Sequence, residues 1–166
     1  MTESEKLKAA RAVAFRFLGY SARSCAEIER RLDRGGFDPS VTAVVVAELR
    51  QEGYLDDESF ASDWIKDRAD RKQYGRSRLK AELVQRGVDG ETIQQAIGAV
   101  TAEDEFRRAL EIALKKQPLT PLTTQGRDEL LQADQKLAQM LHRRGFTWDI
   151  VKQVLALREE NRKELS

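Results

Sequence analysis

The sequence is poor in the residues that build covalent or metal-dependent sites. It has one cysteine, one histidine and three prolines among 166 residues. A single cysteine excludes an intrachain disulfide, and no cysteine or histidine pair has the spacing of a metal site. The longest apolar runs, such as Val44 to Ala47, are far shorter than the ~20 residues of a membrane-spanning helix. The amino terminus also lacks the apolar stretch of a secretory signal. We therefore expect a cytoplasmic protein without metals or cofactors.

Groups that could carry out catalysis are also scarce. His142 lies in LHRRG, at the end of an expected helix, where a cation suits the negative end of the helix dipole. The acidic cluster at residues 56–58 could hold a divalent ion, but carboxylates at a helix start already satisfy unpaired backbone N–H groups. Gly35-Gly36 lacks the Lys-Ser/Thr that follows in a phosphate-binding loop. The sequence therefore predicts that the protein is not an enzyme.

The stretch from Gly53 to Gly87 holds the strongest local signals. An aspartate pair, Asp56 and Asp57, precedes apolar residues on one helical face, which predicts a helix that starts near Asp57. Tyr74-Gly75 ends that helix. A second apolar stripe then runs to Gly87, where a glycine can adopt a left-handed backbone conformation. This pattern predicts a helix, a break, a helix and a glycine stop.

The second half of this pattern occurs three times, each time with an anchor glycine one residue before an apolar residue. The three series are Ile28, Leu32, Gly36, Phe37; Leu79, Leu83, Gly87, Val88; and Leu137, Leu141, Gly145, Phe146. Another helical pattern follows each anchor. The run Val41 to Leu49 would favour a strand by its β-branched residues alone, but its register in the repeat predicts a helix.

An amphipathic segment precedes each of these helix pairs, so the repeating unit has three helices. We place the units at residues 1–55, 56–101 and 102–166, with a Pro/Thr loop at 117–127 in the third. The prediction is an all-α fold of tandem three-helix repeats. Because each repeat would contact mainly its neighbours, we expect an elongated, curved array, and we expect it to be a monomer.

Charge is balanced overall but not locally. The net charge is +1, whereas residues 66–86 carry eight basic and three acidic side chains. Such a density raises the chance of an anionic partner, although charged residues on helices are more often simply solvated. Aromatic residues could also contact a partner. Phe60 and Trp64 share one helical face and are expected in the core, while Trp148 at a helix start suits core packing and partner contact about equally.

Four segments resemble the RecX family of bacterial recombination regulators. They are RSCAEIERRL at 23–32, GYLDDESFA at 53–61, YGRSRLKAELVQRGV at 74–88 and LHRRGFTWDIVKQVL at 141–155. The resemblance covers most of the chain in the family's order. Gln73 departs from it, because the family more usually has glycine before the Tyr-Gly pair, and Met140 stands where an aromatic residue is common. Residues 118–127 match nothing in the family pattern.

The resemblance implies a binding protein that lies in the groove of the RecA filament on single-stranded DNA. Bound there, it would inhibit or remodel the filament and lower strand exchange and coprotease activity. The alternative is a helical DNA-binding protein that acts on DNA through its basic central repeat. The net charge of +1 argues against this alternative, because DNA-binding proteins usually concentrate more positive charge. Weak direct DNA binding is compatible with both. The candidate partner-binding residues are Lys66, Arg71, Lys72, Arg76, Arg78, Lys80, Arg143, Arg144 and Trp148.

Overall fold

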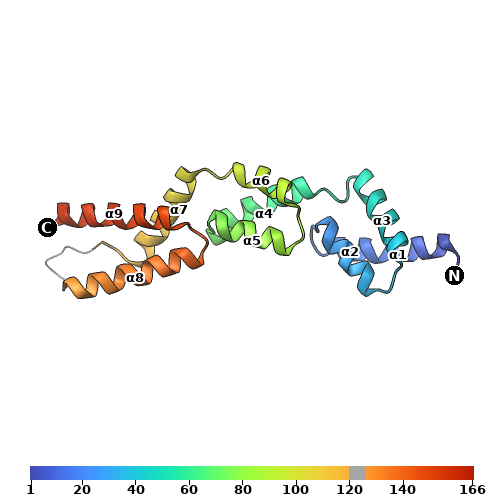
Figure 1. The fold of residues 1–166 in the computed structure, drawn as a ribbon, viewed down its shortest axis with the longest axis horizontal. Coiled ribbons are helices and arrows are strands. Elements are labelled where there is room, and N and C mark those ends of the chain that lie inside the picture. Colours follow the sequence, from blue (N-terminus) through green and yellow to red (C-terminus); the bar gives the residue numbers. More distant parts are fainter. Residues whose placement is uncertain (120–125) are drawn as a thin grey trace. The chain divides into compact units, whose positions relative to one another are not determined.

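The computed structural model describes residues 1–119 and 126–166, which form nine α-helices and no strand. The helices are α1 (Glu3–Leu18), α2 (Cys25–Arg34), α3 (Pro39–Gln51), α4 (Asp57–Lys72), α5 (Arg76–Gln85), α6 (Gly90–Gly98), α7 (Ala102–Lys116), α8 (Arg127–Arg143) and α9 (Trp148–Leu165) (Figure 1). The prediction of an all-α fold is confirmed. None of these helices is both long enough and apolar enough to cross a membrane.

The helix boundaries follow from the signals in the sequence. The β-branched run from Val41 to Leu49 lies inside α3, so the repeat register predicted its structure correctly. The anchor glycines Gly36, Gly87 and Gly145 have φ values of 81°, 77° and 94°, in the left-handed region that glycine tolerates best. Each of them follows the second helix of its repeat and turns the chain toward the third.

The chain divides into two compact units. The first unit contains residues 1–64 and 82–96, and the second contains residues 65–81 and 97–166. Helices α4, α5 and α6 contribute residues to both units, so the middle repeat belongs to neither unit alone.

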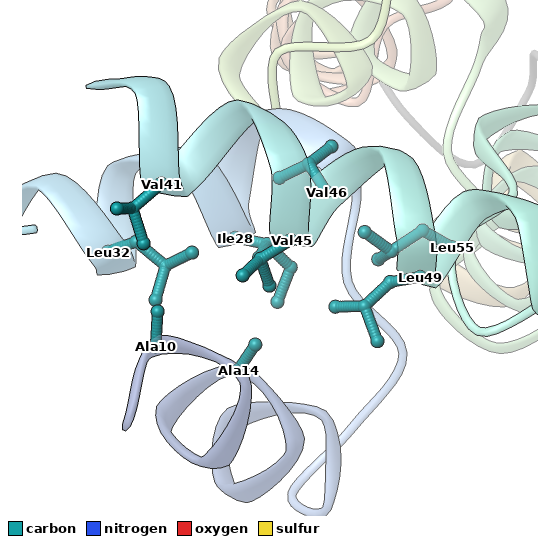
Figure 2. Close-up of a cluster of buried hydrophobic side chains, with 9 residues drawn as sticks. All are labelled: Ala10, Ala14, Ile28, Leu32, Val41, Val45, Val46, Leu49 and Leu55. Atoms are coloured by element: carbon teal, nitrogen blue, oxygen red, sulfur yellow. The ribbon is translucent and has the colours of Figure 1, made fainter. Parts of the chain in front are cut away.

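In the first unit, α1, α2 and α3 pack against one another around an aliphatic core (Figure 2). Its buried members are Ala10, Ala14, Ile28, Leu32, Val41, Val45, Val46, Leu49 and Leu55. Two alanines on α1 permit a close approach, and the valines and leucines of α2 and α3 fill the space between the helices. Burial of a Val, Leu or Ile side chain contributes about 1.5–3 kcal/mol, so this cluster is a principal source of stability for the repeat.

In the second unit, α9 packs against both α7 and α8. The apolar core there contains Ala109, Ile112, Ala113, Leu137, Leu141, Phe146, Ile150, Val151 and Val154. Beyond it, two arginines of α9 are also buried. Arg162 binds the carboxylate of Asp134 through two hydrogen bonds of 2.9 and 2.8 Å, and Arg158 donates to the carbonyl oxygen of Ala113 at 3.4 Å.

The predicted loop at 117–127 falls partly outside the described residues, which omit 120–125. Residues 117–119 and 126 are not helical, whereas Arg127 is already the first residue of α8. The side chain of Gln117 donates a 2.8 Å hydrogen bond to the carbonyl oxygen of Ala133, which ties the end of α7 to α8.

Candidate functional site

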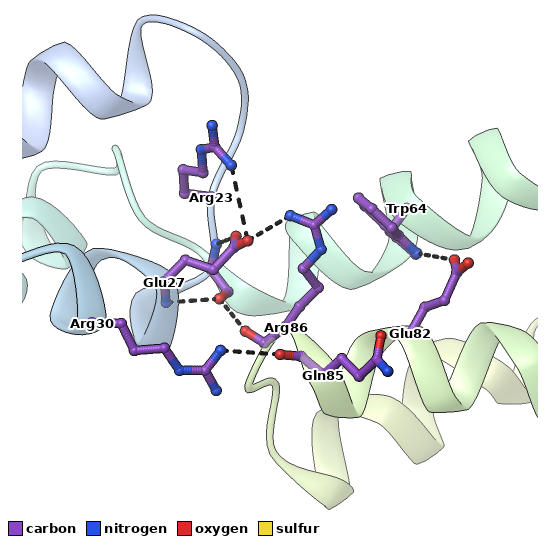
Figure 3. A network of polar contacts seen from close by, with 8 residues as sticks. Arg23, Glu27, Arg30, Trp64, Glu82, Gln85 and Arg86 are labelled. Atoms are coloured by element: carbon purple, nitrogen blue, oxygen red, sulfur yellow. Dashed lines mark hydrogen bonds and ion pairs between the residues drawn. The ribbon is translucent and has the colours of Figure 1, made fainter.

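The start of α2 lies against the end of α5, and we call this contact the first junction (Figure 3). The buried hydroxyl of Ser24 donates to the carbonyl oxygen of Arg86, and Arg30 donates to that of Gln85 at 3.0 Å. A side chain at Gly87 would overlap Ala26, so glycine is required there both for its backbone conformation and for the close approach. The glycine stop is therefore a contact surface as well as a helix terminator.

Two arginines of the first junction share a carboxylate partner within it. Glu27 forms an ion pair with Arg86 and a longer one, of 4.0 Å, with Arg23. The Arg86 guanidinium also lies 4.4 Å from the ring centroid of Trp64, a cation–π distance. The indole of Trp64 in turn donates to Glu82 at 3.0 Å (Figure 3). Carboxylates, an aromatic ring and carbonyl oxygens thus surround the guanidinium groups.

The turn before α5 lies against the end of α8, and we call this contact the second junction. The amide of Gly75 donates to the carbonyl oxygen of Arg144 at 2.8 Å, and the amide of Ser77 donates to that of Gly145 at 3.1 Å. A side chain at Gly75 would collide with the backbone of Gly145, and one at Gly145 would collide with Arg78. The Tyr-Gly pair that breaks the helical pattern is thus the point of closest approach between two segments distant in sequence.

The second junction contains one functional residue that the sequence did not reveal. Glu105 is 2% exposed, and its carboxylate accepts a 2.8 Å hydrogen bond from the amide of Arg76 at the start of α5. It therefore caps a helix from outside that helix. In the sequence, Glu105 is only one of three acidic residues in the first turn of α7, which gave no sign of this contact.

Beside the second junction lies a pocket of about 390 Å³, which we call the cationic pocket. Its lining consists of Lys72, Tyr74, Arg78, Met140, Arg143 and Arg144. Arg144 is held in place by a 2.9 Å hydrogen bond from its guanidinium to the carbonyl oxygen of Lys72. The Arg78 guanidinium lies 3.8 Å from the ring centroid of Tyr74. The end of α4, the turn, α5 and the end of α8 thus bring four cationic side chains to one cavity.

Among the residues that the structure describes, no carboxylate lines the cationic pocket. Within residues 1–119 and 126–166, no ion pair joins Lys72, Arg143 or Arg144 to an acidic side chain, while Arg78 makes further interactions of its own. Guanidinium and ammonium groups supply hydrogen-bond donors but no acceptors. The pocket is therefore chemically suited to an anion that has several acceptor oxygens.

The structure gathers only some of the predicted contact residues. Lys72, Arg78, Arg143 and Arg144 line the cationic pocket, whereas Lys66, Arg71, Arg76, Lys80 and Trp148 do not. Lys66 and Lys80 are exposed, and Arg71 is exposed and ion-paired with Asp67 at 3.0 Å on the same helix. Trp148, which is 49% exposed, stacks on His142 with 4.3 Å between ring centroids. The exposed part of the Trp148 side chain is accessible to a partner.

The acidic cluster at residues 56–58 caps helices. The Asp56 carboxylate accepts from the amides of Glu58 and Ser59, and these bonds, the one from Ser59 first, lower its pKa. Asp57, which we expected to cap its own helix with Asp56, instead accepts a 2.9 Å bond from the amide of Cys25 at the start of α2. Among the residues that the structure describes, no group of three His, Cys, Asp or Glu side chains could hold a metal ion.

Comparison with known proteins matches three family models along the chain. The first, second and third three-helix domains of RecX match residues 10–49, 56–97 and 103–155. The chain is 35% identical over 159 residues to "Regulatory protein RecX" of Mycolicibacterium vanbaalenii, covering 93% of this chain and 86% of that protein. It is 32% identical to the protein of the same name from Amycolatopsis mediterranei, covering 86% and 78%.

The solved structures agree in fold. The crystal structure of RecX from Lactobacillus salivarius superposes with a TM-score of 0.80 at 16% identity, covering 94% of this chain and 98% of that one. A second crystal structure of regulatory protein RecX gives a TM-score of 0.76 at 19% identity, covering 92% and 73%. At these identities the likeness concerns the fold alone.

Proposed function

Because the chain belongs to the RecX family of regulatory proteins, we propose that it binds the RecA filament on single-stranded DNA and inhibits or remodels it. Strand exchange and coprotease activity would fall as a result, and the protein would act in the cytoplasm as a monomer. The observation that carries this proposal is the cationic pocket, where four basic side chains meet without a carboxylate. A filament that contains DNA is a polyanion, and such a pocket suits contact with it.

We propose action by binding and not by catalysis. The cationic pocket is lined by lysine, arginine, tyrosine and methionine, and contains no histidine, cysteine or carboxylate to serve as base or nucleophile. The only cysteine that the chain offers is unsuited to that work, because burial raises the pKa of the Cys25 thiol to about 11. The site supplies charge and shape, which are what recognition of a partner requires.

The exposed basic residues outside the pocket have a supporting role in the proposal. Lys66, Arg71 and Lys80 lie on α4 and α5 and are open to solvent. An exposed charged contact is worth about 1 kcal/mol or less, so no single one of these residues would determine affinity. Together they would speed association with a polyanion in low salt.

The test is inhibition of RecA-driven strand exchange by a charge-reversed variant. Lys72→Glu with Arg143→Glu replaces two pocket cations that have no acidic partner among the described residues. The matched control is Lys115→Glu with Lys152→Glu, which reverses two exposed lysines of α7 and α9. We expect the concentration for half-inhibition to rise about tenfold for the pocket variant only, since tenfold corresponds to about 1.4 kcal/mol.

Both variants should retain the circular dichroism of the parent, so that a loss of inhibition reports lost contact and not lost folding. Equal inhibition by the parent and the pocket variant in low salt would remove the cationic pocket from the contact surface. Co-sedimentation with RecA on single-stranded DNA, beside DNA alone at rising salt, then separates the proposal from its alternative of direct action on DNA. Binding to DNA alone at the same affinity as to the filament would favour the alternative.

A further inference from the structure

The two junctions are built from equivalent positions of the repeat but carry different charges. Glu27 and Arg78 each lie nine residues before the anchor glycine of their own repeat, Gly36 and Gly87. Arg86 and Arg144 each lie one residue before the anchor of the following repeat. Hydrogen bonds agree with this alignment, because the corresponding residues Ser24 and Gly75 donate, through a hydroxyl and an amide respectively, to the carbonyl oxygens of Arg86 and Arg144. The two junctions can therefore be compared position by position.

At the first junction the equivalent pair attracts, and at the second it does not. Glu27 accepts a hydrogen bond from the Arg86 guanidinium and neutralises it. In the second junction, Arg78 occupies the repeat position that Glu27 occupies in the first. An arginine side chain cannot accept a hydrogen bond. Arg144 consequently directs one donor to the carbonyl oxygen of Lys72 and has no acidic partner among the described residues. The second junction thus has no carboxylate at the repeat position from which Glu27 pairs with Arg86 in the first.

The backbone fixes this arrangement of like charges. Gly75 and Gly145 approach so closely that neither position can carry a side chain, and two amide hydrogen bonds link the segments. The segments that carry the pocket cations are therefore held together by backbone contacts that do not depend on charge. Like charges held near one another destabilise the free protein, and an anion placed among them relieves that repulsion.

We propose that the cationic pocket is a binding site for the phosphodiester groups of a nucleic acid strand. This inference rests on the proposed function, because it names the ligand chemistry of the same site. A phosphodiester offers acceptor oxygens and a permanent negative charge, which complement arginine forks and a lysine ammonium. An acidic peptide would also bring backbone N–H donors, and a lining of lysine, arginine, tyrosine and methionine gives those donors few acceptors. A sugar-phosphate backbone brings no N–H donors, so its binding leaves no such donor without an acceptor.

The decisive variant is Arg78→Glu, which gives the second junction the charge pattern of the first. The new carboxylate would stand where Glu27 stands relative to Arg86, and would be placed to pair with Arg144. We expect binding of a fluorescent oligothymidylate to the full chain to weaken about tenfold or more, while the melting temperature stays at or above that of the parent. A residue with a merely structural role would give the opposite result for stability.

Because Arg78 makes other interactions, its replacement could weaken binding by disturbing them, and a second variant at another residue of the pocket controls for this. Arg143→Glu changes an exposed cation of the pocket, and Lys152→Glu on α9 is the matched control outside it. Arg143→Glu should weaken oligothymidylate binding and reduce the slope of log affinity against log salt, since each phosphate contact on a single strand contributes about 0.7 to that slope. The control should change both quantities only by the small, non-specific effect of reversing one distant charge.

The outcomes separate this inference from the proposed function. If the parent does not bind oligothymidylate, or if Arg78→Glu and Arg143→Glu bind it like the parent, the phosphodiester site is wrong. If those variants bind oligothymidylate normally but lose inhibition of RecA, the pocket contacts acidic groups of the protein filament, so the inference fails and the proposed function stands. If they lose oligothymidylate binding and still inhibit RecA fully, the phosphodiester site stands and the proposed use of the pocket in inhibition fails.

Discussion

The amide of Gly75 donates a 2.8 Å hydrogen bond to the carbonyl oxygen of Arg144, and this bond joins a helix break to the end of a helix in the next repeat. Carbonyl groups in the last turn of a helix lack partners within the helix. Here one of them is satisfied by a turn of the preceding repeat. The hydroxyl of Ser24 likewise donates to the carbonyl oxygen of Arg86, so the ends of the second helices serve as docking surfaces between repeats. The residues around them decide what else each surface can bind.

Replacing the anchor glycines by alanine should destabilise the protein by different amounts, depending on how closely other atoms approach each glycine. Gly36→Ala should cost about 1–2 kcal/mol, because the left-handed conformation is unfavourable for any residue with a Cβ and nothing lies within 4 Å of that position. Gly145→Ala should cost about 2–4 kcal/mol, because its side chain would also overlap Arg78. Urea unfolding followed by circular dichroism measures both. Equal losses at the two positions would show that the second junction relaxes freely around a methyl group.

Gln73 offers a stabilising substitution. Its φ of 53° makes it the one residue other than glycine with a positive φ among those described. The Gln73→Gly variant should be more stable by about 0.5–1 kcal/mol, because glycine removes the left-handed penalty but adds entropy to the unfolded chain. The control Gln73→Ala removes the same polar group without relieving the backbone and should show no gain in urea unfolding. A gain for alanine equal to that for glycine would mean that the side chain, not the backbone, carries the strain.

Sequence patterns anticipated the backbone of this protein well because its signals are local. A glycine that follows an apolar helix face and precedes an apolar residue needs nothing distant to explain it, so Gly36, Gly87 and Gly145 could be found from spacing alone. The family pattern even marked Gln73, where glycine is usual, and that position proved to need a left-handed backbone. The expectation for Val41 to Leu49 succeeded for a related reason, since the repeat register carries more information than local propensity.

The sequence supplied the cations of the site but not their arrangement. The candidate residues included all four basic residues of the pocket, Lys72, Arg78, Arg143 and Arg144, but also others, such as Lys66, that do not line it. Contact between the end of α4 and the end of α8 depends on Gly75 packing on Gly145, a pairing that no local pattern encodes. The repeats do carry one further signal. When they are aligned on their anchor glycines, Arg78 falls opposite Glu27, so the charge reversal between the two junctions is present in the sequence itself.

The thiol of Cys25 should react slowly with alkylating agents. Burial, followed by the nearby charge of Asp57, raises its pKa to about 11, and only the thiolate is nucleophilic. An unperturbed thiol has a pKa of about 8.5, so at pH 8 the folded protein should react about 200-fold more slowly than the protein in urea. The rate in the folded state should keep rising about tenfold per pH unit through pH 9, because the thiolate fraction is still small there. A rate that levels off below pH 9 would show that the thiol is less perturbed than its surroundings suggest.

The pair formed by Asp134 and Arg162 should be the most sensitive polar contact in the third repeat. The Arg162 side chain is 5% exposed and donates two hydrogen bonds to one carboxylate, and this bonding raises the pKa of the arginine. Asp134→Ala would leave that guanidinium buried and unpaired beside Arg158, whose pKa is lowered by burial and by the charge of Arg162. We expect a loss of about 2–4 kcal/mol in urea unfolding, since removing one partner of a buried pair leaves an uncompensated charge.

The companion variant distinguishes that stranded charge from a simple loss of contact. Asp134→Ala combined with Arg162→Met removes both charges and keeps most of the apolar volume of the arginine side chain. The double variant should therefore recover at least half of the stability lost by Asp134→Ala alone, in the same urea titration. Lys163→Ala, which breaks the exposed 3.2 Å pair with Glu159 on α9, is the surface control and should cost less than about 0.5 kcal/mol. If the double variant is less stable than the single one, the ion pair itself, and not the avoidance of an unpaired arginine, is what α8 and α9 depend on.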